Sequence, residues 1–113
     1  MNELVQMHCS PINSNSIQLT ELERNQMLKK LSGWVINKKD DELRLEKQFM
    51  FKDFNQAVNF TNLVAQVANK EDHHPAILTE WAKVTVTWWT HKIKGLHMND
   101  FIMAAKTDQV FKN

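Results

Sequence analysis

Residues 43–68 read LRLEKQFMFKDFNQAVNFTNLVAQVA, and the spacing of their apolar side chains changes once along this stretch. Over 43–51 apolar and polar residues alternate, which predicts a strand with one buried face. Only Lys47 interrupts the alternation. Over 54–69 the apolar residues recur every three or four positions, which predicts an amphipathic helix. Asp53 is a suitable cap for the start of that helix. A strand leading directly into a long helix is therefore the organising feature of the chain.

The same signals, followed outward in both directions, predict the remaining elements. Thr20 and Glu23 have the spacing of a capping box at the start of a first helix. Pro75 ends the loop after the long helix, because proline forces the preceding residue out of the helical region. In chain order the sequence predicts a helix over 20–31, a strand from 34, a charged turn at 38–41, the strand and long helix already described, a loop at 70–75, strands at 77–81 and 84–91, and a helix over 98–110. This order, α-β-β-α-β-β-α, predicts an α+β fold with an antiparallel sheet.

Length and composition restrict the function classes. The chain has 113 residues, 42% of them hydrophobic and 24% charged, which predicts one globular domain. Fourteen Lys and Arg against 13 Asp and Glu leave a formal net charge of +1. This charge is too small to neutralise a run of phosphates, which argues against a dedicated nucleic-acid binder. No apolar stretch approaches the roughly 18 residues needed to cross a membrane. We expect a small soluble protein of the cytoplasm.

Residues 1–19 are predicted to be a flexible tail, and residues 20–113 a single domain. The run 10–16, SPINSNS, is polar and turn-prone, with no helical or strand period. The first residues lack the basic and apolar regions of a signal peptide. Cys9 is the only cysteine, which excludes an internal disulfide and a four-cysteine zinc site. His8 and Cys9 alone make a poor metal site, because structural zinc needs four converging ligands.

Three histidines are the candidate functional residues: His73, His74 and His91. Imidazole titrates near neutral pH and can both give and take a proton in one turnover. The first two lie in a predicted loop and the third at a strand end, where scaffolds present reactive groups. Two alternatives stay open. The histidines could be solvated or packed, or with Asp72 they could hold zinc, although adjacent residues seldom direct both imidazoles at one ion.

The adjacent residues Trp88 and Trp89 must face opposite sides of their strand. Alternation places Val84 and Val86 with Trp88 on one face, and Trp89 with His91 on the other. A large aromatic on the far face favours a subunit interface. The other interpretation is that Trp89 forms the wall of a site for a flat heterocycle.

The spacing of the histidines resembles the signature of the pterin-4a-carbinolamine dehydratase family. The resemblance covers about residues 20–110, and over 78–108 it is most similar to the bacterial branch associated with phenylalanine hydroxylase. The matching residues are His73-His74-Pro75, then Trp81, His91 and Asp100, with five, nine and eight residues in between. Further matches are Gly33-Trp34, Phe51-Lys52-Asp53-Phe54, Thr90 and Gly95-Leu96.

The resemblance implies a four-stranded antiparallel sheet with three helices packed on one face. It also implies a homo-oligomer, either a dimer or a tetramer. The implied reaction removes water from 4a-hydroxytetrahydrobiopterin to give quinonoid dihydropterin, with no metal and no organic cofactor. This reaction recycles the cofactor of aromatic amino-acid hydroxylases, so a functional link to phenylalanine hydroxylase is expected.

The resemblance also assigns roles to particular residues. The acid–base set is His73, His74 and His91. The substrate site adds Asp72, Trp89, Thr90 and Lys92 to these histidines. The signature residues Pro75, Trp81 and Asp100 are structural, and Asp100 suits the first turn of the last helix.

The sequence departs from the family pattern at three positions. Asn69 replaces the usual acidic residue before the histidine pair, Lys94 replaces a glycine, and His97 replaces a threonine, which predicts a weaker helix cap. The alternative function is that of a non-catalytic module for dimerisation, assembly or regulation, built on the same scaffold. A pure interaction protein would have no physical need for all three histidines.

Overall fold

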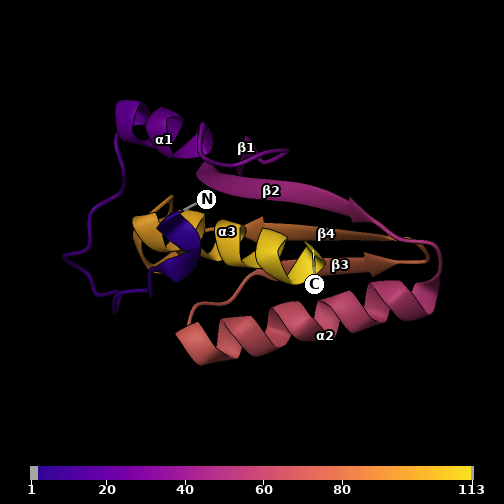
Figure 1. Ribbon diagram of the computed structural model, residues 1–113. Coiled ribbons are helices and arrows are strands. Elements are labelled where there is room, and N and C mark those ends of the chain that lie inside the picture. Colours follow the sequence, from indigo (N-terminus) through magenta and orange to yellow (C-terminus); the bar gives the residue numbers. More distant parts are fainter. Residues whose placement is uncertain (1–2, 113) are drawn as a thin grey trace.

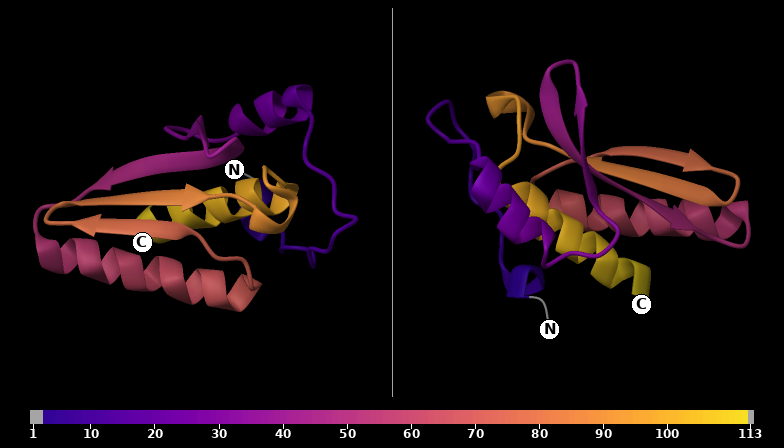
Figure 2. Two further views of the ribbon diagram at one scale, coloured as in Figure 1. Left: turned by 180° about the vertical axis from the view of Figure 1, so that it is seen from behind. Right: turned by 90° about the horizontal axis from the view of Figure 1, so that it is seen from above.

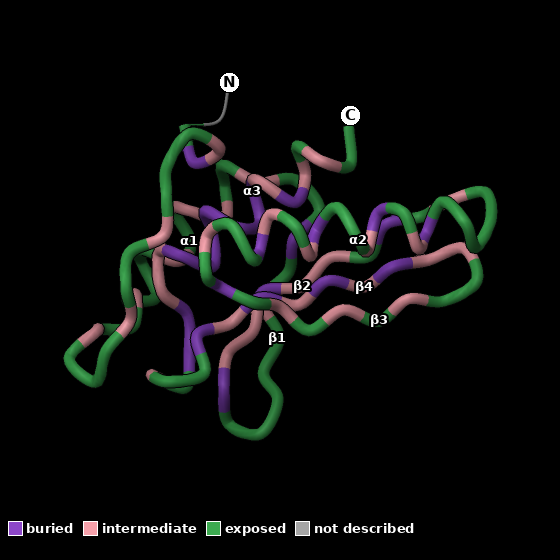
Figure 3. Tube along the Cα trace, turned by 90° about the horizontal axis from the view of Figure 1, so that it is seen from below, coloured by how far each residue is buried: buried purple, intermediate pink, exposed green. Residues whose placement is uncertain are grey.

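The computed structural model describes residues 3–112 as a four-stranded sheet with three α-helices (Figure 1). The strands are antiparallel neighbours in the order β1-β2-β4-β3, and the three helices lie on one side of the sheet (Figure 3). The predicted fold class and element order are confirmed. The elements are α1 (Glu21–Leu28), β1 (Val35–Lys39), β2 (Glu42–Met50), α2 (Phe54–Glu71), β3 (Ala76–Glu80), β4 (Lys83–Trp88) and α3 (Met98–Lys112), with 3₁₀ turns at Glu3–Gln6 and His91–Ile93.

The hairpin of β1 and β2 closes through a two-residue turn. Asp40 and Asp41 both have positive φ, 53° and 65°, as the two central residues of a type I′ turn do. Lys39 pairs with Glu42 across this turn. The turn is therefore shorter than the predicted charged turn at 38–41, because its two lysines belong to β1.

The long helix α2 begins as its sequence predicts. The Asp53 side chain accepts a hydrogen bond from the backbone N–H of Gln56 at 2.8 Å. The buried face consists of Ala57, Phe60, Val64 and Ala68, at three- and four-residue spacing. The helix continues two residues beyond the predicted end and stops where Asp72 takes a left-handed conformation, with φ of 54°. This stop turns the chain toward β3.

The core side of β4 is the alternating set Val84, Val86 and Trp88, all fully buried, as predicted. The strand ends at Trp88, three residues before the predicted end. Its regular pairing stops there because Thr90 instead forms an isolated bridge with Gly95. The intervening residues make a 3₁₀ turn that starts at His91. Thr90 and His91 therefore lie beyond the strand, at the end of the sheet where β4 stops.

Lys47 has the parity of the buried residues of β2, which explains the break in the alternating pattern. Its ammonium lies at the edge of the core, 4.9 Å from the ring centroid of Phe49. There it donates 2.8 Å hydrogen bonds to the Ser32 carbonyl and to Oδ1 of Asp108 in α3. Gly33 leaves room for this side chain, because a Cβ at Gly33 would stand 3.0 Å from Lys47 Cε. The aliphatic stem of Lys47 thus packs while its charge is paired.

The first half of α3 is the most enclosed part of the molecule. Every residue from Asn99 to Ala105 is buried, which requires cover on more than one side of the helix. The sheet and α2 cover part of it, and the turn Glu3–Gln6 covers another part (Figure 2). Leu4 in this turn is only 1% exposed. Residues 3–6 of the expected tail therefore contact the domain.

The start of α3 uses His97 as its cap. The imidazole Nδ1 of His97 accepts a hydrogen bond from the Asn99 N–H at 3.0 Å, and the Asp100 carboxylate accepts the His97 N–H at 2.9 Å. The cap therefore requires an unprotonated Nδ1. None of the helices within residues 3–112 combines the length and apolar character needed to span a membrane.

We expect Thr107→Val to lower the free energy of unfolding by about 1–3 kcal/mol, because it leaves a buried donor unpaired. Thr107 Oγ1 accepts the indole N–H of the buried Trp88 at 3.1 Å. Urea unfolding at one protein concentration measures the change. Thr85→Val on the outer face of β4 is the matched control, and we expect it to stay within about 0.5 kcal/mol of the parent. Equal losses of unfolding free energy in the two variants would contradict a stabilising role for the hydrogen bond between Trp88 and Thr107.

We expect acid to destabilise the fold in part through His97. Burial lowers the pKa of His97 below its ordinary value, and the nearby His73 adds to this effect, while Asp100 and the Asn99 contact oppose it. The unfolded chain then binds the proton more readily than the folded chain. The His97 contribution is complete above about pH 6.5 and is lost as the pH falls below that value.

His97→Thr keeps a cap oxygen and removes the titration. Urea unfolding at pH 7.5 and 5.5 should therefore show a smaller loss of stability in the variant than in the parent. The same loss of stability in both proteins would show that His97 does not contribute to the acid sensitivity of the fold.

Candidate active site

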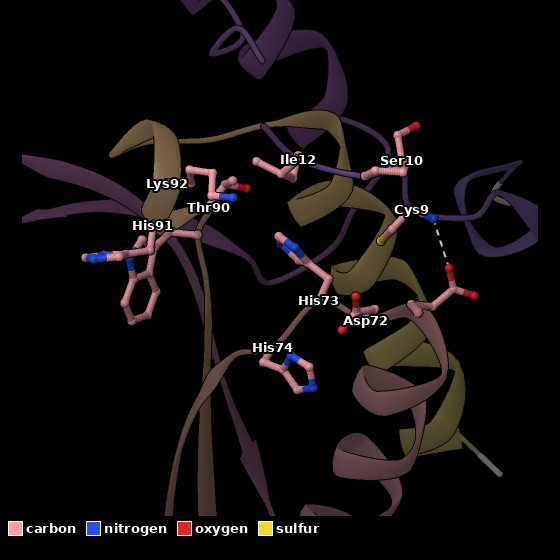
Figure 4. Close-up of a pocket in the computed structure, with 12 residues that line it drawn as sticks. Cys9, Ser10, Ile12, Asp72, His73, His74, Thr90, His91 and Lys92 are labelled. Atoms are coloured by element: carbon pink, nitrogen blue, oxygen red, sulfur yellow. Dashed lines mark hydrogen bonds between the residues drawn. The ribbon is translucent and has the colours of Figure 1, made fainter. Parts of the chain in front are cut away.

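One cavity of about 640 Å³ opens at the end of the sheet where α2 and β4 stop and β3 begins. A volume of this size suits a small organic ligand. Three separate stretches of chain line it: residues 9–12, 71–74 and 89–92. The cavity therefore brings together every residue predicted to be catalytic or substrate-binding: Asp72, His73, His74, Trp89, Thr90, His91 and Lys92. Figure 4 shows how the labelled side chains surround it.

Asp100 is completely buried beside this cavity, at the start of α3. Its Oδ1 lies 2.7 Å from Nε2 of His73. Its Oδ2 accepts from the Thr90 hydroxyl at 2.8 Å and from the backbone N–H of His97 at 2.9 Å. Asp100 does more than cap its helix, because it ties both sides of the cavity to α3.

His73 is held in one orientation. Its ring is buried and stacks on Trp88, with centroids 5.9 Å apart and an interplanar angle of 8°. A carboxylate can only accept, so the hydrogen bond to Asp100 requires the proton on Nε2 of His73. Nδ1 is then the nitrogen that can exchange a proton with a ligand.

His74 is held more loosely, at the surface. Its Nε2 lies 3.0 Å from the side-chain amide oxygen of Asn69, which is in the last turn of α2. An amide oxygen also only accepts, so Nε2 of His74 carries the proton and Nδ1 is available. Asn69 thus orients His74 with a neutral group, at the position where the family pattern has an acidic residue.

His91 lies across the cavity on the 3₁₀ turn after β4. Its side chain is 85% exposed, and its ring points away from His73 and His74 (Figure 4). Its Nδ1 is 4.0 Å from Oε1 of Glu42 in β2. The neighbouring backbone is fixed, since Thr90 N–H donates to the Gly95 carbonyl at 2.9 Å. His91 borders the cavity, but its ring is the least restrained of the three.

The sequence did not identify a charged cluster beneath His91. The guanidinium of Arg44 lies 4.0 Å from the ring centroid of Trp89 and 3.8 Å from Glu42. Arg44 therefore stacks over the ring of Trp89, and Trp89 is also one of the residues that line the cavity. Three buried atoms here have no hydrogen-bond partner: Glu42 Oε1, Arg44 Nε and Trp89 Nε1. Strand parity was the available signal, because Glu42 and Arg44 share the outer face of the sheet.

The sequence also did not identify residues 9–12 as cavity residues. Burial raises the pKa of the Cys9 thiol to about 12, with a further contribution from the charges of Glu71 and Asp100. The thiol is therefore protonated at neutral pH. No short-range pattern marked this contact, because the contacting residues are 62 and 89 positions away.

The other signature residues occupy different surroundings. Pro75 separates His74 from β3, where it sets the end of the loop. Trp81 lies exposed in the turn between β3 and β4, at the opposite end of the sheet from the cavity (Figure 1). Within residues 3–112, no three His, Cys, Asp or Glu side chains come together as a metal site.

A family model and several solved structures are similar to this chain. The family model described as pterin 4 alpha carbinolamine dehydratase matches residues 17–110. A transcriptional coactivator/pterin dehydratase from Brucella melitensis is 37% identical, with a TM-score of 0.74 over 83% of this chain and 98% of that one. A pterin dehydratase-like RuBisCO assembly factor of the alpha-carboxysome has a similar fold at 21% identity, with a TM-score of 0.59 over 70% of this chain and 89% of that one.

The family match, over residues 17–110, spans the segments that carry the three histidines and Asp100. The chain belongs to the pterin 4 alpha carbinolamine dehydratase family.

Proposed function

We propose that this protein dehydrates 4a-hydroxytetrahydropterin to quinonoid dihydropterin. The observation that carries the proposal is the single cavity bordered by His73, His74 and His91. Two of these imidazoles have one nitrogen occupied by a protein acceptor and the other nitrogen free. Groups arranged in this way can transfer protons to and from a flat ring without rearranging.

The reaction requires two proton transfers. The bond between ring carbon 4a and the hydroxyl oxygen breaks, and the oxygen leaves as water after it gains a proton. The hydrogen on nitrogen 5 is lost as a proton, and its electron pair forms the double bond to carbon 4a. No electrons are gained or lost overall, so one general acid and one general base suffice.

The three imidazoles are held in different ways, which supports different roles in the two proton transfers. The Asp100 carboxylate fixes the buried ring of His73, while the neutral amide of Asn69 orients the exposed ring of His74. His91 borders the opposite side of the cavity, and rotation about its exposed side chain brings its ring toward a ligand. Asp72, Trp89, Thr90 and Lys92 are proposed to bind the pterin.

The proposed cellular role is to regenerate the tetrahydropterin used by an aromatic amino-acid hydroxylase, in the cytoplasm and as a homo-oligomer. The names of the two relatives support a second candidate, a binding or assembly module on the same scaffold. Stable capture of a partner together with no turnover would favour that second candidate.

We expect the purified protein to accelerate the decay of 4a-hydroxytetrahydropterin formed in situ by a hydroxylase. The double variant His74→Ala/His91→Ala should lose most of this acceleration, since a general acid or base contributes about 10²- to 10⁴-fold. The measurement is the decay rate above the spontaneous background. Gln66→Ala, on the exposed surface of α2, is the control and should keep the parent rate. An unchanged rate in the double variant would refute the site.

We expect Asp100→Asn to lower kcat by about 10- to 100-fold, because an amide cannot accept from all three donors around residue 100. Asp100 is a positioning residue, so the Kd for 7,8-dihydrobiopterin should change much less than kcat. Thr107→Val serves as a destabilised control in the same helix and should keep its kcat. If both variants lost kcat in proportion to stability, Asp100 would have only a structural role.

A further inference from the structure

The N-terminal strap, residues Cys9–Ile12, forms one side of the cavity, with Cys9 beside the end of α2 and Ile12 between His73 and Lys92 (Figure 4). The proposed dehydratase function assigns nothing to these residues. Two side chains from the helices hold the strap in place, one in α2 and one in α3.

The first anchor is Glu71 in the last turn of α2, whose side chain is 6% exposed. Its Oε1 accepts the backbone N–H of Cys9 at 2.9 Å, and its Oε2 lies 2.8 Å from Nδ1 of His8. Lys106 of α3 is 3.8 Å from the same carboxylate and donates to the Val5 carbonyl at 2.8 Å. Burial alone would raise the pKa of Glu71, but these partners outweigh it and hold the pKa below its ordinary value. Glu71 is therefore charged at neutral pH and holds the strap.

The second anchor is Asn99 in the first turn of α3, which is 1% exposed. Its Oδ1 accepts the Ser10 N–H at 2.9 Å, and its Nδ2 donates to the Ser10 carbonyl at 2.8 Å. Both polar groups of a buried amide are thus used on one residue of the strap. Such paired bonds fix the direction of the strap as well as its position.

The anchors determine what the strap presents to a ligand. The backbone groups of Cys9 and Ser10 that face Glu71 and Asn99 are already hydrogen-bonded. Pro11 has no N–H. Ile12 is half-buried at the cavity and lies outside the hydrophobic core formed by the described residues. The side chains of Pro11 and Ile12 are therefore an apolar part of the lining, whereas the other lining segments carry His73, Asp72 and other polar groups.

We propose that the anchored strap is the apolar wall of the ligand site and that Ile12 contacts the bound pterin and sets its affinity. This inference rests on the proposed function. A flat heterocycle would lie with hydrogen-bonding groups on the histidine side and carbon on the strap side. Removing most of the Ile12 side chain takes buried apolar area away from the complex.

The binding test uses the full-length chain and 7,8-dihydrobiopterin, a pterin without the 4a-hydroxyl. We expect Ile12→Ala to raise the Kd, measured by calorimetry, about tenfold. Ile17→Ala is the matched control, since it is the same substitution in the same segment at a side chain that is 81% exposed and outside the cavity. It should stay within about twofold of the parent, a negligible free-energy change. Equal Kd values for the two variants would overturn the role of Ile12.

The anchoring is tested without any ligand, through Cys9, the only thiol in the chain. Ser10→Pro removes the N–H that Asn99 accepts, without altering a core side chain. We expect its reaction with dithionitrobenzoate to be about fivefold faster than the parent's, the shift that one lost hydrogen bond produces. Ser14→Pro is the control, because it falls in the turn Asn13–Ser16 at a position that favours proline.

The two experiments separate the possible failures. A parent protein that binds no dihydrobiopterin would overturn the proposed function and the ligand contact of Ile12 together. Equal thiol reactivity in Ser10→Pro, Ser14→Pro and the parent would overturn the anchored strap even if the pterin binds. Pterin binding with faster thiol reaction only in Ser10→Pro, and weaker binding only in Ile12→Ala, supports the inference.

Discussion

The rest of the site depends on the hydrogen bonds of one buried carboxylate, that of Asp100. A charge taken out of water is costly unless donors replace the lost hydration. Asp100 recovers these interactions from His73, Thr90 and the backbone of His97, which lie in the loop before β3, just after β4 and just before α3. Because none of these segments satisfies the carboxylate alone, the buried Asp100 requires all three to be in place.

The chemistry of the cavity follows from which atoms the protein has already engaged. On the histidine side, acceptors from the protein hold Nε2 of His73 and of His74, so that Nδ1 of each ring is left for a ligand. On the strap side, Glu71 and Asn99 engage backbone groups of Cys9 and Ser10, and Pro11 and Ile12 supply apolar side chains to the lining. A site with a proton-transferring side and an apolar side suits a flat heterocycle that must lose water and one ring proton.

Periodicity was enough to predict the elements of the fold, because the buried residues of α2 and β4 recur at the regular spacing of a helix and of a strand. Boundaries were less accurate where a contact outside the element decided them, as at Thr90, which bonds to Gly95 instead of extending β4. The histidines were identified by residue type and by family spacing. The strap was not, since a short segment that contacts Glu71 and Asn99, 62 and 89 positions further along the chain, has no local period to detect.

The orientation of His73 is the most direct test of this account. Long-range ¹H–¹⁵N correlation spectra of the imidazoles, recorded on the full-length protein with and without 7,8-dihydrobiopterin, report which ring nitrogen carries the proton. We expect a proton on Nε2 of His73 in the free protein and a change in its Nδ1 signal when the pterin binds. A proton on Nδ1 alone, or a His73 signal that ignores bound pterin, would contradict it.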